Sequence, residues 1–84
     1  MIVDELRAIV AEVAEVDPAT IELDGALADV GVDSLMAIEI AVDVERRYEL
    51  TFDVDELRRI TTFASLVELT AGRLAEREGA STAR

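Results

Sequence analysis

Apolar side chains recur at intervals of three and four residues near the start of the chain. The positions that follow this spacing are Ile2, Leu6, Ile9, Val10, Val13 and Val16. Such spacing predicts an amphipathic helix over residues 2–16. Asp17-Pro18 is expected to end this helix, because the residue before a proline is disfavoured in the α region.

A second helix is predicted over residues 34–49, and it carries two apolar stripes where a bundle helix needs one. The first stripe consists of Ala37, Ile40, Ala41, Val44 and Tyr48. The second consists of Leu35, Ile38 and Val42, with Met36 beside it. This second stripe is either covered by the preceding loop or exposed as a contact strip, and the pattern leaves both possibilities open. Asp33 and Ser34 are both residue types that cap helix N-termini.

A long connection is predicted between these two helices, over residues 17–33. Gly25 and Gly31 mark turns in it. Its apolar residues are expected to pin it to the core; they are Ile21, Leu23, Leu27 and Val30.

Two further helices complete the predicted fold. A short helix over residues 54–59 has Asp53 as its cap, and a longer one over residues 63–77 has Thr61 or Thr62 as its cap. The side chains of this last helix expected to face inward are Phe63, Leu66, Val67, Thr70 and Leu74. The fold class is therefore all-α, a small four-helix bundle with three longer helices and one short helix. Residues 1–77 form the single domain, and residues 78–84 are expected to form a flexible tail.

Composition supports a folded intracellular domain. Apolar residues make up 51% of the chain, which argues against disorder despite a net charge of −11. There is no cysteine, which fits a reducing compartment and predicts a cytoplasmic location. The N-terminus lacks the basic and apolar regions of a secretory signal, and no apolar run is long enough to cross a bilayer.

The charge is distributed unevenly, because no basic residue occurs between Ala8 and Glu45. Such an acidic field repels nucleic acid and anionic membranes, and it attracts basic protein surfaces. We therefore expect protein partners and neither nucleic acid nor membrane. The alternative is that these acids only keep a small protein in solution.

Ser34 has no side chain to activate it as a catalyst. The sequence contains no histidine and no lysine, so the serine hydrolase interpretation of Asp33-Ser34-Leu35 is excluded. Met36 stands where the nucleophile-elbow pattern requires a second glycine. Asp53 and Asp55 resemble the start of a calcium loop, but the glycine and glutamate of that loop are missing. No catalytic residue and no metal site is predicted, and the chain is not expected to be an enzyme.

The segment Gly31-Val32-Asp33-Ser34-Leu35, followed by the helix start Met36-Ala37-Ile38-Glu39-Ile40, resembles the attachment motif of acyl carrier proteins. The similarity extends from about Ile2 to Leu74. It implies that Ser34 carries 4′-phosphopantetheine, donated by coenzyme A through a phosphopantetheinyl transferase. The thiol of that arm would hold acyl groups as thioesters, and the bundle would shelter short acyl chains between its helices. The alternative for Ser34 is a hydroxyl that only caps its helix.

By the same resemblance, the helix over residues 34–49 docks onto partner enzymes. The residues implied in docking are Asp33, Leu35, Met36, Ile38, Glu39, Val42, Asp43 and Glu45. The implied partners are the transferase and a ketosynthase, an acyltransferase or other acyl-processing enzymes, and the chain is expected to be a free-standing monomer.

Two features favour polyketide or other specialised metabolism over fatty-acid synthesis. Arg46-Arg47 lies where many fatty-acid carriers are acidic, and Met36 lies where they often have a polar residue. A carrier of fatty-acid synthesis and an aminoacyl or peptidyl carrier stay as alternatives. The alternative of another class is an acidic interaction module without a prosthetic group.

Overall fold

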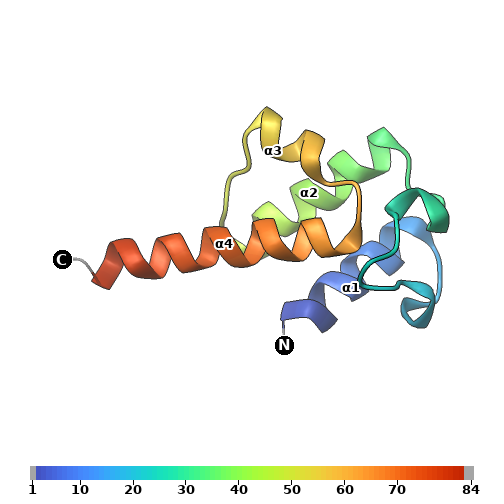
Figure 1. Cartoon of the computed structure of the whole chain (residues 1–84), viewed down its shortest axis with the longest axis horizontal. Coiled ribbons are helices and arrows are strands. Elements are labelled where there is room, and N and C mark those ends of the chain that lie inside the picture. The colour runs from blue at the N-terminus through green and yellow to red at the C-terminus, as the bar shows by residue number, and fades with distance from the viewer. Residues whose placement is uncertain (1, 83–84) are drawn as a thin grey trace.

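Within residues 2–82 the chain forms four α-helices, and a long loop connects the first helix to the second (Figure 1). We describe a computed structural model, which covers the backbone of residues 2–82 and the side chains of residues 2–77. The helices are α1 (Ile2–Ala14), α2 (Ser34–Tyr48), α3 (Val54–Arg59) and α4 (Phe63–Thr82). Helix α1 packs against α2 and α4, and α3 packs against α2. The predicted four-helix architecture with one short helix is confirmed.

The centre of the core is built from side chains of α1, α2 and α4, with Phe63 as its largest fully buried residue. The largest fully buried side chains are Leu6, Val10, Ile40, Val44, Phe63, Leu66 and Thr70. Thr70 is the polar member of this set, and its hydroxyl donates a hydrogen bond to the Leu66 carbonyl at 2.8 Å. Because that bond satisfies the hydroxyl, the core carries no unpaired polar group at this position.

Two helices end with a glutamate in the left-handed region. Helix α1 ends at Ala14, before the predicted residue 16, because Glu15 has a φ of 57°. Helix α2 ends at Tyr48, because Glu49 has a φ of 53°. Glycine is the usual residue at such a position, so the sequence held no signal for either turn. The prediction that Asp17-Pro18 ends the first helix was therefore wrong.

The long loop contains two 3-10 turns, η1 (Pro18–Thr20) and η2 (Leu27–Val30), and is bonded to the start of α4. The Leu27 N–H donates to the Thr61 carbonyl at 3.0 Å, and the Phe63 N–H donates to the Gly25 carbonyl at 3.2 Å. An antiparallel bridge pairs Ala26 with Thr62. These backbone bonds fix the loop beside the N-terminus of α4.

The loop is also held by side chains, although not by all those predicted. Ile21 and Leu27 are buried as expected, and Val32 is buried as well. Leu23, which was expected to pin the loop, is 46% exposed. Its carbonyl accepts the Ala64 N–H at 2.8 Å, so the backbone rather than the side chain holds the loop at this point.

Arg7 joins the loop to two helices. Its Nε donates to the Ile21 carbonyl at 3.1 Å, and its guanidinium lies 5.2 Å from the centre of the Phe63 ring. A guanidinium over an aromatic face is attracted by the ring quadrupole. Arg7 of α1 therefore contacts both the loop and α4.

The last helix begins as predicted and extends further than predicted. Thr62 caps it, because its Oγ1 accepts the Ser65 N–H at 3.0 Å. The helix continues past Arg77 to Thr82, and its far end projects beyond the other helices in Figure 1. The expected end at residue 77 was therefore too early. The flexibility of residues 78–84 stays a prediction, and residues 83–84 lie outside the described part. No helix within residues 2–82 is both long and apolar enough to cross a membrane.

Tyr48 joins the end of α2 to the start of α1, and this contact predicts an unusual titration. Its hydroxyl donates to Glu5 Oε1 at 2.8 Å. Burial, together with the hydrogen bond and charge of Glu5, raises the pKa of Tyr48 from 10.0 to about 12. The contribution of the protonated Tyr48 to the free energy of unfolding is complete below pH 10. It is lost as the pH rises towards 12, because the native state holds the phenol proton more tightly than the unfolded state.

Ultraviolet titration of the phenol measures this directly, since Tyr48 is the single tyrosine. Glu5→Gln should lower the pKa towards the ordinary value, because the amide carries no charge. A native protein that titrates near pH 10 would show that the contact with Glu5 is absent in solution.

Candidate functional site

Residues 31–36 place the hydroxyl of Ser34 at the start of α2. Gly31 has a φ of 87°, a conformation that favours glycine, and it ends η2. Val32 is buried and Asp33 caps α2, because its Oδ1 accepts the Met36 N–H at 2.8 Å. Ser34 follows as the first helical residue. Each residue before Ser34 therefore has a structural role that fixes where the serine lies.

The Ser34 hydroxyl is not used by the fold. Ser34 is exposed, and its side chain makes no hydrogen bond within the described part of the chain. Asp33 performs the capping that a serine could have performed, so the interpretation of Ser34 as a helix cap is wrong. The N–H groups of Ser34 and Leu35 lack partners in the same range, as expected for the first turn of a helix.

The second apolar stripe of α2 is exposed. Leu35 is 67% exposed, Ile38 49% and Val42 37%. The long loop therefore leaves this stripe open, and the two possibilities left by the sequence are resolved in favour of a contact strip. Met36 lies differently, because it is half-buried and packs against the core.

The acidic residues of α2 also differ in their availability. Glu39 is exposed, whereas Asp43 and Glu45 are half-buried. The Glu45 carboxylate accepts the Phe52 N–H at 2.8 Å, so this side chain holds the chain that follows α2. Of the three acids, Glu39 is therefore the one that is exposed to a partner.

A groove of about 490 Å³ lies between α2, α3 and the long loop, and Ser34 is at its border. Helix α2 and helix α3 each supply part of its lining: Ser34, Ala37 and Ile38 from the former, and Val54, Leu57 and Arg58 from the latter. The sequence had suggested space between the helices without naming these residues. No local pattern could have found them, because Ser34 and Arg58 are brought together only by the packing of α3 against α2.

Comparisons with known proteins agree with this arrangement. The family described as "Phosphopantetheine attachment site" matches residues 4–70. The chain is 43% identical over 67 residues to the non-reducing polyketide synthase azaA of Aspergillus niger. It is 40% identical over 75 residues to the non-reducing polyketide synthase pkiA of Emericella nidulans. These matches cover 80% and 89% of this chain, and the chain spans 3% of each synthase.

A solved structure matches over nearly its whole length. It is hexanoyl acyl carrier protein, a non-natural intermediate, from the actinorhodin polyketide synthase of Streptomyces coelicolor. The TM-score is 0.77 and the identity 34%, over 87% of this chain and 90% of that one.

The four-helix fold, the family match and the similarity to a solved carrier structure together define this chain as a carrier domain. The chain belongs to the acyl carrier protein family, whose members hold 4′-phosphopantetheine covalently.

Proposed function

We propose that Ser34 is the residue that receives the 4′-phosphopantetheine arm. The observation that carries this proposal is the free, exposed Ser34 hydroxyl beside a cap supplied by Asp33. In the transfer, Ser34 Oγ forms a bond to the phosphorus on the pantetheine side of coenzyme A. The pyrophosphate bond breaks, 3′,5′-ADP leaves, and the hydroxyl proton passes to the transferase or to water.

The start of α2 suits the phosphodiester that this transfer produces. The two unpartnered N–H groups of Ser34 and Leu35 and the positive end of the helix dipole favour a negative charge there. Asp33 keeps its own carboxylate on the Met36 N–H. When bound, the arm supplies a thiol that holds acyl groups as thioesters, and we expect partner enzymes to catalyse the reactions of those groups.

We further propose that the acyl groups belong to polyketide biosynthesis. The support is that azaA, pkiA and the actinorhodin carrier are all named as parts of polyketide synthases. A ketosynthase and an acyltransferase are then the partners to expect. A free-standing monomer in the cytoplasm stays a prediction, as do the fatty-acid and aminoacyl alternatives for the cargo.

Incubation with coenzyme A and a broad-specificity phosphopantetheinyl transferase tests the role of Ser34. Intact-mass analysis should show one added arm per chain, and peptide mapping should place it on Ser34. Folded protein that gains no mass while a known carrier is modified in the same tube would refute the proposal. That result would favour an acidic interaction module instead.

Charge reversal at Glu39 should slow recognition by the transferase. Glu39 is exposed and lies beside the strip of Leu35, Ile38 and Val42, so Glu39→Arg places a positive charge where a basic partner would dock. We expect the modification rate to fall about fivefold at low salt, which corresponds to about 1 kcal/mol. Added salt should reduce the difference because it screens exposed charges.

Glu68→Arg is the matched control for this prediction. Glu68 is also exposed but lies on α4, and the substitution changes the net charge by the same amount. Equal rates for the two variants would show that overall charge, rather than α2, governs docking.

A further inference from the structure

Helix α3 forms one wall of the groove although none of its residues is buried. Its exposed residue Val54 and its half-buried residue Leu57 line the groove. The buried side chains Phe52 and Ile60 flank the helix and are 5% and 6% exposed. Helix α3 is therefore flanked by two buried apolar residues, and of its own apolar side chains only Leu57 packs against the core.

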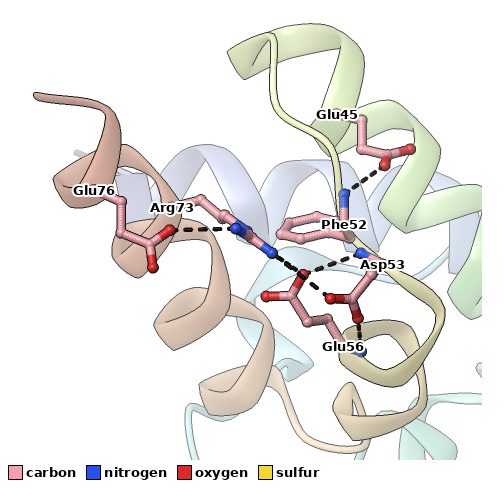
Figure 2. A network of polar contacts seen from close by, with 6 residues as sticks. All are labelled: Glu45, Phe52, Asp53, Glu56, Arg73 and Glu76. Atoms are coloured by element: carbon pink, nitrogen blue, oxygen red, sulfur yellow. Dashed lines mark hydrogen bonds and ion pairs between the residues drawn. The ribbon is translucent and has the colours of Figure 1, made fainter. Parts of the chain in front are cut away.

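Polar contacts hold the N-terminal end of α3 (Figure 2). Asp53 and Glu56 form a capping box: the Glu56 N–H donates to Asp53 Oδ1 at 2.8 Å, and the Asp53 N–H donates to Glu56 Oε1 at 3.0 Å. Just before it, the Glu45 carboxylate of α2 accepts the Phe52 N–H. The capping box stabilises the helix, but it does not join α3 to α4.

Arg73 of α4 makes that connection. Its guanidinium donates to Glu56 Oε1, lies 4.0 Å from an Asp53 carboxylate oxygen, and lies 3.2 Å from Glu76 of its own helix. The Glu56 side chain is only 15% exposed, compared with 65% for Asp53 and 70% for Glu76. The pair with Glu56 is therefore the least exposed to water and salt of the three.

The charge state of the pair agrees with its geometry. The Asp53 N–H and the Arg73 guanidinium lower the pKa of Glu56 below its ordinary value, and Glu56 raises that of Arg73. Both groups are thus charged at neutral pH, as an ion pair requires.

We propose that Arg73 is a positioning residue, which through Glu56 fixes α3 and thereby the width of the groove that receives the acyl group. This inference rests on the proposed attachment of the arm to Ser34, which borders the same groove. Arg73 itself does not line the groove. It acts through Glu56, which lies one position before the lining residue Leu57.

Amide hydrogen exchange of the unmodified protein tests the contact without any loading. Glu56→Gln keeps a side-chain oxygen for the Asp53 N–H and removes the charge, while Arg73→Gln removes the guanidinium. We expect the Leu57 and Ile60 amides to exchange about threefold faster in both variants, with α1 amides unchanged. Glu76→Gln is the matched control, because it removes a partner of Arg73 that lies outside α3 and should leave these amides unchanged.

Thioester reactivity tests the consequence for the groove. A broad-specificity transferase can load the protein from acetyl- or hexanoyl-coenzyme A, and hydroxylamine then cleaves the thioester at a measurable rate. A hexanoyl group that enters the groove is cleaved more slowly than an acetyl group. The readout is the ratio of the acetyl to the hexanoyl cleavage rate. In Glu56→Gln and Arg73→Gln this ratio should fall about threefold towards one, whereas in Glu76→Gln it should stay unchanged.

The two measurements separate the possible failures. No loading at Ser34 would refute the proposed function, while amide exchange would still decide whether Arg73 holds α3. Unchanged exchange rates of the Leu57 and Ile60 amides in both Glu56→Gln and Arg73→Gln would overturn the inference. Faster amide exchange with an unchanged cleavage ratio would also overturn it. So would equal cleavage rates of acetyl and hexanoyl groups in the original protein, or changes in Glu76→Gln as large as those in the other two variants.

Discussion

Ser34→Ala should abolish uptake of the arm completely, while leaving the fold intact. Ser34 Oγ is the atom that forms the new bond, and α2 contains no other serine or threonine. Because Ser34 makes no hydrogen bond within the described chain and Asp33 supplies the cap, its loss removes no structural contact. We expect helical circular dichroism and the unfolding midpoint to be nearly unchanged. Intact-mass analysis after incubation with coenzyme A and the transferase gives the readout.

Ser65→Ala provides the opposite pattern and serves as the control. The Ser65 hydroxyl oxygen accepts the N–H groups of Thr61 and Thr62 and donates to the Thr62 carbonyl, so it supports the start of α4. Its loss should cost about 1 kcal/mol of stability and leave modification intact. Modification that survives in Ser34→Ala would place the attachment site elsewhere and refute the assignment.

Phe63→Ala should destabilise the protein by about 3–5 kcal/mol, the usual cost of removing a buried aromatic ring. Phe63 is completely buried, lies beneath the Arg7 guanidinium, and begins α4 where its N–H meets the Gly25 carbonyl. A cavity there weakens the contacts among α1, the loop and α4 together. Since small domains are stable by about 5–15 kcal/mol, the variant should lose much of its stability.

Urea unfolding followed by circular dichroism measures this loss. Val54→Ala is the comparison variant, because Val54 is 63% exposed and its truncation should change stability by less than about 0.5 kcal/mol. Similar losses in the two variants would mean that the ring does not occupy the core in solution.

The sequence predicted the helices well where periodicity and capping chemistry agreed. Helix α3 and the start of α4 fall where Asp53 and Thr62 provide caps. It failed at Glu15, which adopts a left-handed conformation without the glycine that usually signals it, and the end of α2 differs by one residue because Glu49 does the same. The end of α4 was also misjudged, because nothing local after Arg77 obliges a helix to stop.

The site was predictable in part for the same reason. The motif around Ser34 is contiguous, and it indicated the class of protein, which the family match confirms. Attachment of the arm at Ser34 stays a proposal. The exposure of Leu35, Ile38 and Val42 was not predictable, since covering them depended on the path of a loop that is held by backbone bonds to α4. The structural use of Glu45, which accepts the Phe52 N–H, was equally invisible in the sequence.

The residue pattern alone specifies the four helices, the acidic character and the segment around Ser34, in a chain without a histidine or lysine to activate a serine. These properties depend on residues close together in the chain, where spacing and side-chain type act directly. Three features come from the folded structure: Asp33 rather than Ser34 is the cap, one stripe of α2 is open, and α3 lines a groove beside Ser34. The open stripe and the groove depend on contacts between distant segments of the chain. The cap depends on which of two neighbouring residues is the first in the helix.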